Sequence, residues 1–181
     1  MGRSREFSHK YLPRCGDHRR LCLGTGACIY HKNTQQERQV GNKVIGQYQH
    51  NIDAKGRLFI PAKFREELGE TFYVTIGLDG CLSVYSDSKW ADLTEKFDAL
   101  PISQARRMRT LFANAAKCEP DAQGRILIPT KLREYAALER EVIINGMSKC
   151  VELWNPERWA PIEVDGLDSD NLAATMEELG F

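Results

Sequence analysis

A duplicated motif constrains the fold of this chain more than any other feature of its sequence. Residues 53–66 read DAKGRLFIPAKFRE and residues 121–134 read DAQGRILIPTKLRE, so nine of fourteen positions are identical at an offset of 68. The similarity continues beyond the motif, since Trp90 matches Trp159 after a one-residue slip. Two copies of one supersecondary unit therefore account for most of the chain, and such short units complete their cores by packing against each other.

Each copy predicts the same order of elements: strand, strand, short helix, strand, strand, helix. In the first copy, Tyr48 and Ile52 alternate with polar residues as in a strand with one buried face. The sequence Asp-Ala-x-Gly-Arg then predicts a tight turn. Gly69 predicts a left-handed end for the short helix, and Asp87 and Asn155 are predicted to cap the last helix of each copy. The predicted segments are 57–60, 61–68, 72–77 and 81–86 in the first copy and 125–128, 129–136, 141–145 and 150–154 in the second.

The fold class that these patterns predict is α+β, with the two repeats packed about a pseudo-twofold axis. Each copy holds too few apolar side chains to bury a core alone, so both are expected to share one β-rich core with peripheral helices. Residues 101–116 are predicted to be an amphipathic helix. Its core-facing side chains are expected to be Ile102, Ala105, Met108, Leu111 and Phe112. The predicted divisions are an N-terminal extension (1–43), the first repeat (44–99), a linking helix (100–116), the second repeat (117–164) and an acidic tail (165–181).

The charge of the chain is distributed unevenly, although its net value is zero. Residues 1–43 carry nine basic and three acidic residues (+6), residues 44–161 carry sixteen of each, and residues 162–181 carry six acids and no base (−6). Local patches rather than net charge therefore decide which partners bind. Hydrophobic residues make up 42% of the chain, which excludes wholesale disorder. No apolar run is long enough to cross a bilayer, so we expect a cytoplasmic protein without a membrane partner.

The duplicated residues resemble those of a known family. The run GQYQHNIDAKGRLFIPAKFREELG (46–69) and the second copy at 121–134 are similar to the MraZ family of bacterial transcriptional regulators. The resemblance covers about 44–181 and implies two AbrB-like, SpoVT-type DNA-binding elements with a swapped-hairpin-like β fold. It further implies assembly into rings, association with the nucleoid, and binding to short direct repeats in the promoter of the division and cell-wall gene cluster. The DNA-facing motifs are then 53–57 and 121–125.

Residues 1–43 have no counterpart in that family and show no helix or strand period. Our interpretation is that Val44 is the true start, encoded by GTG, and that residues 1–43 are a translated leader. The alternative is a disordered basic arm that adds nonspecific phosphate contacts. The segment contains four residues whose spacing superficially resembles a zinc site: Cys15, His18, Cys28 and His31. We predict no metal there, because the surrounding residues offer little core to support one.

The Asp-x-x-Gly-Arg turn offers a way to contact DNA. Gly56 permits a tight turn and close approach of the backbone to a ligand. Arg57 carries a planar fork of donors that suits guanine or a phosphate, and Asp53 can orient that guanidinium. The counterparts in the second copy are Asp121, Gly124 and Arg125. The alternative is that each Asp–Arg pair merely holds its own turn. Duplication and the family resemblance favour DNA contact.

Lys55 and Gln123 occupy the one position of the turn that differs between the copies. Lysine adds a charge for phosphate, whereas glutamine can bond adenine bidentately, so the copies are predicted to read DNA unequally. Four residues of the short helices are candidate contacts to the DNA backbone, with a solvated helix face as the alternative: Lys63, Arg65, Lys131 and Arg133. Arg106, Arg107 and Arg109 on the linking helix are assigned to subunit contacts or solvent.

Together with these patterns, the resemblance implies a sequence-specific DNA-binding regulator, a repressor, that binds promoter DNA as a homo-oligomeric ring. One subunit contributes few phosphate contacts and binds weakly, whereas a ring adds contacts through effective concentration. The alternative class is a ring-forming interaction scaffold without specific DNA binding. No enzyme, cofactor, metal or small-molecule substrate is predicted, because His50 lies in a strand and no catalytic motif is present. Cys81, Cys118 and Cys150 are predicted to be buried, inert thiols.

Overall fold

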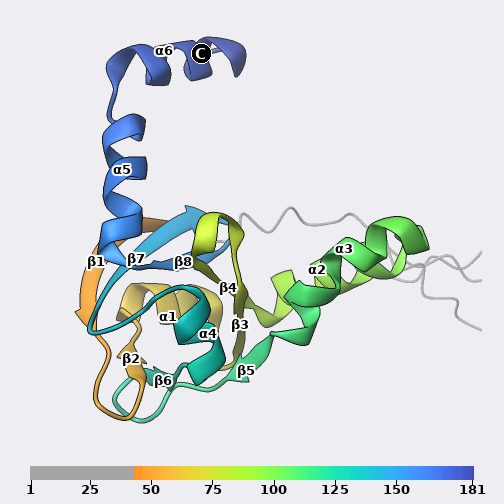
Figure 1. Ribbon diagram of the computed structural model, residues 1–181, viewed down its shortest axis with the longest axis vertical. Coiled ribbons are helices and arrows are strands. Elements are labelled where there is room, and N and C mark those ends of the chain that lie inside the picture. The colour runs from red at the N-terminus through yellow and green to blue at the C-terminus, as the bar shows by residue number, and fades with distance from the viewer. Residues whose placement is uncertain (1–42) are drawn as a thin grey trace, which may run out of the picture. The chain divides into compact units, whose positions relative to one another are not determined.

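The computed structural model describes residues 43–181, which form a mixed α+β fold built from two tandem repeats (Figure 1). The first repeat contains β1 (Val44–Asn51), β2 (Arg57–Phe59), α1 (Ala62–Leu68), β3 (Phe72–Ile76), β4 (Leu82–Ser86) and α2 (Asp87–Asp98). The second contains β5 (Ala116–Cys118), β6 (Arg125–Leu127), α4 (Thr130–Tyr135), β7 (Glu141–Ser148), β8 (Val151–Trp154) and α5 (Pro156–Gly166). A linking helix α3 (Ile102–Ala113) and a last helix α6 (Ser169–Glu178) complete the set, with a 3-10 turn at Leu78–Gly80. The predicted order of elements is confirmed in both repeats.

The strands of the two repeats are interleaved rather than separate. One antiparallel sheet has the order β1-β7-β8-β4-β3-β5, and β2 pairs with β6 in a two-stranded ribbon. The first strand of each repeat pairs with the other repeat, β1 with β7 and β5 with β3. The strand order reads the same from either end when each strand is exchanged for its counterpart. In the ribbon, Leu58 pairs with its own counterpart Ile126, so the pseudo-twofold axis passes between them.

One hydrophobic core serves both repeats. The inward side chains of the ribbon, Leu58 and Ile126 among them, have no exposed surface. Phe64 of α1 and Leu132 of α4 join the same cluster, together with the inward residues of the large sheet. Figure 1 shows α1 and α4 in the middle of this arrangement, with β2 and β6 beside them. Because the cluster draws on both copies, neither repeat has a core that excludes the other.

Several details of the sequence prediction are wrong, for identifiable reasons. Strand β7 continues to Ser148, three residues beyond its predicted end, because β1 pairs with it along its whole length. The side chain of Ser86, not Asp87, caps α2 by accepting from the Lys89 amide. Gly69 has a positive φ of 88° as predicted, but its ψ of −168° lies outside the left-handed helical region. Asn155 caps α5 as predicted.

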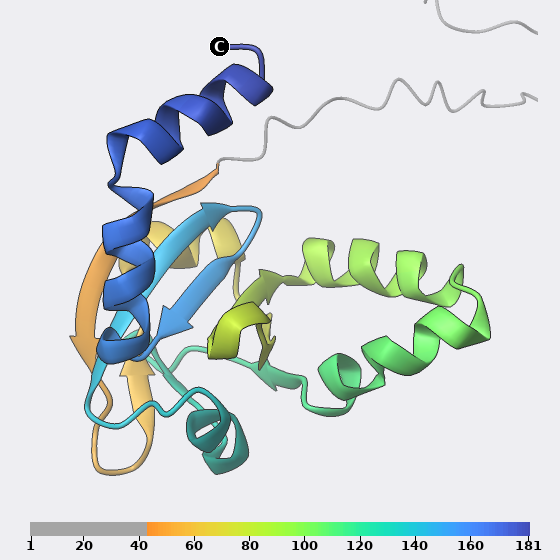
Figure 2. The same cartoon turned by 45° about the horizontal axis from the view of Figure 1, so that its top comes forward.

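The linking helix also differs from its prediction. It ends at Ala113, and Ala116 begins β5 because that strand pairs with β3. Ile102 is 76% exposed, so the prediction that it faces the core is wrong. Figure 2 shows α2 and α3 running alongside each other in opposite directions. They meet through aromatic side chains: the Phe112 ring lies 5.2 Å from the Trp90 ring, which stacks on Tyr73 at 4.8 Å.

Helix α6 is exposed along its entire length. Asp168 caps its first turn by accepting from the amides of Asp170 and Asn171, yet no α6 residue is buried. Its exposed apolar side chains include Leu172 and Met176. The acidic tail therefore contains a helix, which extends from Ser169 to Glu178. Among residues 43–181, no helix has the length and apolar character needed to span a membrane.

Candidate nucleic-acid interface

The first turn is built by the carboxylate of Asp53. Its Oδ1 atom accepts from the backbone amides of Lys55 at 2.9 Å and Arg57 at 3.0 Å. The Asp53 carbonyl also accepts from the amide of Gly56 at 2.9 Å. Gly56 completes the turn with a φ of 80°, a conformation that other residues adopt only with strain. The Asp-x-x-Gly-Arg spacing thus sets the turn through side-chain and backbone bonds together.

The second turn repeats this geometry closely. Oδ1 of Asp121 accepts from the amides of Gln123 at 3.0 Å and Arg125 at 2.9 Å, and Gly124 has a φ of 78°. Because β2 and β6 are adjacent and antiparallel, the pseudo-twofold axis brings the two turns to the same ribbon. The sequence motif is therefore present twice in one local structure.

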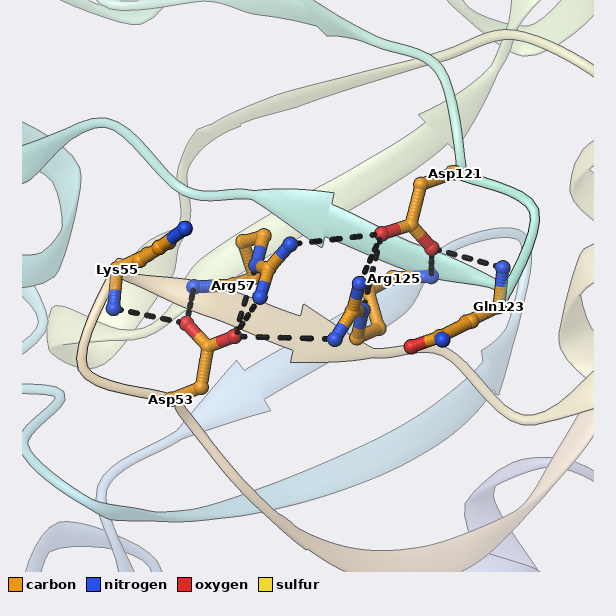
Figure 3. Close-up of polar contacts among 6 residues, drawn as sticks. All are labelled: Asp53, Lys55, Arg57, Asp121, Gln123 and Arg125. Carbon is orange, nitrogen blue, oxygen red and sulfur yellow. Dashed lines mark hydrogen bonds and ion pairs between the residues drawn. The ribbon is translucent and has the colours of Figure 1, made fainter.

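Four charged side chains form a closed cluster across this ribbon, which we call the Asp–Arg quartet: Asp53, Arg57, Asp121 and Arg125 (Figure 3). Within each turn, the arginine Nη2 lies 2.7 Å from the aspartate Oδ2, and Nε donates to the same oxygen. Between turns, Nη1 of Arg57 lies 3.9 Å from Asp121, and Nη1 of Arg125 lies 4.0 Å from Asp53. The four side chains are 26–35% exposed, so both guanidinium groups reach one solvent-facing surface.

Both carboxylates of the quartet are ionised near neutral pH, because their pKa values are low. The hydrogen bond from the Arg57 side chain, with those from the Arg57 and Lys55 amides, lowers the pKa of Asp53 to about 2. The Arg125 side chain and amide, with the Gln123 amide, lower the pKa of Asp121 to about 2. The bond to Asp121 raises the pKa of Arg125 above its ordinary value. Two positive and two negative charges alternate around the cluster, so its net charge is zero.

The arginines of the short helices hold the opposite turns. Nε of Arg65 donates to the Ile60 carbonyl at 3.0 Å, and a Cβ placed on Gly124 would lie only 2.8 Å from its guanidinium carbon. Arg133 lies against Gly56 in the same way, at 3.0 Å. Both glycines are consequently buried. The close approach that glycine permits is made by an arginine of the other repeat, which the sequence analysis missed because nothing local indicates this pairing.

The remaining site residues lie around these turns. Lys55, Gln123, Lys63 and Lys131 are exposed, as are the three arginines of α3, Arg106, Arg107 and Arg109. The structure thus brings the predicted turn residues to one ribbon and assigns an internal hydrogen bond to each of Arg65 and Arg133. Arg57 and Arg125 bond the aspartates of their turns and are also partly exposed at the surface. An Asp–Arg pair can therefore hold its own turn and still be available for contact with DNA.

Comparison with known proteins finds the same protein family in each of the two repeats. The model of the MraZ protein family, described as antitoxin-like, matches residues 44–110 and again residues 111–179. The chain belongs to the MraZ family. A curated relative from Halothermothrix orenii, named transcriptional regulator MraZ, is 47% identical over 141 residues, which cover 76% of this chain and 99% of that protein.

Other MraZ relatives give the same result. The protein of Caldicellulosiruptor saccharolyticus is 50% identical over 142 residues, covering 76% of this chain and 99% of the relative. That of Heliobacterium modesticaldum is 54% identical over 119 residues, covering 64% of this chain and 83% of the relative. Both are also named transcriptional regulator MraZ. In this MraZ chain, the first family match covers β1 to most of α3, and the second covers β5 to α6. The boundary between the two matches, at residues 110 and 111, lies a few residues before the end of α3.

The described part of this MraZ chain offers little for covalent or metal chemistry. Burial raises the pKa of Cys81 to about 12, and of Cys118 and Cys150 to about 11, so these thiols stay protonated and unreactive at neutral pH. His50 packs its ring 5.0 Å from Phe59. No group of three or more metal-ligating residues occurs within residues 43–181. Two predictions concern residues that the structure does not describe. The zinc-like spacing involves Cys15, His18, Cys28 and His31, and the interpretation of 1–43 as a leader involves only one described residue, Lys43.

Proposed function

We propose that this MraZ-family protein is a DNA-binding transcriptional regulator rather than an enzyme, and that the outer face of the β2–β6 ribbon contacts DNA. The observation that carries the proposal is the placement of Arg57 and Arg125 on one exposed surface. In each arginine, Nη1 is the guanidinium nitrogen that has no close carboxylate partner. Nη1 of Arg57 lies 3.9 Å from Oδ2 of Asp121, and Nη1 of Arg125 lies 4.0 Å from Oδ2 of Asp53. Those donors can bind guanine or phosphate oxygens while Nε and Nη2 stay on their aspartates.

Positive charge around the neutral quartet supports this orientation toward DNA. Lys55 extends from the first turn, and Lys63 and Lys131 are exposed on the adjacent helices α1 and α4. These side chains are suited to phosphate contacts, and Gln123 is suited to a base edge. Gly56 and Gly124 act indirectly, by letting Arg133 and Arg65 hold the turns. The site therefore separates base reading at the quartet from phosphate contacts around it.

The strand exchange between repeats supports an AbrB-like, swapped-hairpin arrangement. Strand β1 leaves the first repeat to pair with β7, and β5 pairs with β3 in return. In this arrangement each DNA-facing turn follows a strand held by the other repeat. The two turns cannot move independently without disturbing the shared sheet, so they present their arginines to DNA as one unit.

Assembly into a homo-oligomeric ring explains how weak sites bind firmly. A single ribbon neutralises few phosphates, whereas linked subunits raise the effective concentration of every further contact. Helix α6 supports the proposal, because an isolated helix of 10 residues is marginal in water and α6 leaves Leu172 and Met176 exposed. Its acidic residues complement the exposed arginines of α3 on a neighbouring subunit. A head-to-tail contact of this kind closes into a ring when the rotation permits.

The target that this function requires is a promoter with several short direct repeats, as the family resemblance implies for the division and cell-wall gene cluster. Occupancy of such repeats by a ring blocks polymerase and gives repression. The protein then acts in the cytoplasm, at the nucleoid. Each subunit contacts one repeat, so affinity depends steeply on the number of repeats.

A gel-shift series tests this function against the scaffold alternative. The probes are the promoter fragment upstream of the division and cell-wall genes, fragments with one, two and three repeats, and a scrambled fragment of equal length. The regulator predicts retardation of the promoter fragment that weakens steeply with salt and exceeds additivity as repeats are added. Equal retardation of promoter and scrambled DNA contradicts sequence-specific binding. A ring that retards no DNA supports the scaffold instead.

A further inference from the structure

The outer face of the β2–β6 ribbon carries two apolar side chains beside its two arginines. Leu127 lies directly opposite Arg57, and Phe59 lies directly opposite Arg125. Side chains of paired residues point to the same face of an antiparallel pair, and the alternate residue Leu58 has no exposed surface. Leu127 and Phe59 therefore share the solvent-facing side of the ribbon with the quartet.

The two apolar residues are counterparts in the repeat, but only one is covered. The Phe59 ring packs against His50 at 5.0 Å and against the Arg65 guanidinium at 5.8 Å, which leaves Phe59 half-buried. Leu127 is 59% exposed. The residue that corresponds to His50 in the second copy is Cys118, which is itself buried and places no ring over Leu127. The pseudo-twofold site thus has one half in which the apolar side chain is partly covered and one half in which it is open.

We propose that Leu127 is a specificity-determining residue of the DNA site, and that it contacts the 5-methyl group of a thymine next to the base that Arg57 reads. The inference rests on the proposed DNA-binding function. Thymine is the base whose major-groove edge presents a methyl group, and apolar side chains contact it there. DNA fits this position, because Arg57 lies opposite Leu127 and its Nη1 atom is 3.9 Å from the nearest carboxylate of the other turn, while the exposed Lys55 and Lys63 can contact phosphates.

This contact gives the site a direction along DNA. A perfectly symmetric ribbon would read the same sequence in both half-sites. Here one half combines Arg57 with the open Leu127, whereas the other combines Arg125 with the covered Phe59. The difference adds to that between Lys55 and Gln123. A directional site matches DNA elements repeated in the same orientation, which is the arrangement that the proposed function requires.

Single-atom changes in the DNA test the contact. Fluorescence anisotropy measures the affinity of the full-length protein for promoter DNA in which each thymine is replaced in turn by uracil, which removes only the methyl group. Burial of one methyl group predicts that uracil at one position of each repeat weakens binding by about fourfold per contact. Leu127→Ala should weaken binding to the unmodified DNA and abolish the response to uracil. Leu78→Ala, at an exposed leucine of the 3-10 turn, should keep that response.

The outcomes separate the inference from the function on which it rests. Binding that is insensitive to uracil at every position, or an equal uracil response in wild type and Leu127→Ala, overturns the thymine contact and leaves DNA binding intact. If the wild type binds neither promoter nor uracil-containing DNA, the proposed function fails as well. Circular dichroism and light scattering establish that Leu127→Ala retains its fold and assembly, as expected for an exposed side chain.

Discussion

Substitution of Gly124 by alanine perturbs the contact between the repeats that the turns depend on. Gly124 has a φ of 78°, and its added Cβ would lie 2.8 Å from the guanidinium of Arg65. Positive φ costs an alanine about 1–2 kcal/mol. Displacement of Arg65 sacrifices its bond to the Ile60 carbonyl, which contributes about 1–2 kcal/mol for a half-exposed charged donor. We therefore expect Gly124→Ala to lower the free energy of unfolding by about 2–4 kcal/mol.

A double-mutant cycle separates the two contributions. Urea unfolding, at one fixed subunit concentration, compares wild type, Gly124→Ala, Arg65→Ala and the double variant. Once Arg65 is removed, Gly124→Ala should cost only the conformational part, so the double variant is less destabilised than the sum by about 1–2 kcal/mol. Gly166→Ala is the control, because nothing lies within 4 Å of its Cβ position. Costs that add within about 0.5 kcal/mol refute the reasoning that Arg65 occupies the space of that Cβ.

The quartet, the core and α6 can each be tested by substitution. Because the pKa values of Asp53 and Asp121 are lowered to about 2, these carboxylates stabilise the fold fully above their ordinary pKa of 3.8 and progressively less as the pH falls toward 2. In urea unfolding, the variant with both aspartates changed to asparagine should lack this loss of stability at low pH, and an identical loss in wild type and variant contradicts the prediction. Phe64→Ala should cost about 3–5 kcal/mol in unfolding free energy, and a cost below about 1 kcal/mol contradicts the shared core. Leu172→Lys with Met176→Lys should reduce the assembly mass in light scattering, whereas an unchanged mass excludes α6 from the subunit contact.

Local sequence was sufficient for elements whose determinants are local. The turn at Asp53 forms as predicted because its carboxylate bonds amides only two and four residues away. Asn155 caps α5 through amides two and three residues away. The duplication also predicted one shared core, since both copies had to contribute apolar residues to it. These features depend on spacing along the chain, which a sequence displays directly.

Contacts between residues that lie far apart in the chain could not be predicted from the sequence. The pairing of β1 with β7 extended β7 to Ser148, and no pattern in that strand indicated it. The same is true of Arg65, whose contact with Gly124 crosses from one repeat to the other. Alternation along β6 does not reveal that Leu127 stays open while Phe59 is covered, because the difference comes from residues of other elements. Register and cross-repeat packing therefore had to come from the structure.

The central claim is that the duplicated arginine-bearing turns form a DNA-binding surface, and the affinity of an arginine variant for promoter DNA tests it most directly. Fluorescence anisotropy compares wild type with Arg57→Ala/Arg125→Ala, and with Lys89→Ala/Lys96→Ala as a control that removes equal charge from exposed positions of α2. At about 1–3 kcal/mol for each arginine contact, the turn variant should bind at least about 30-fold more weakly at unchanged assembly mass. The α2 control should stay near wild type. Wild-type affinity in the turn variant, with its fold and assembly intact, would contradict the account.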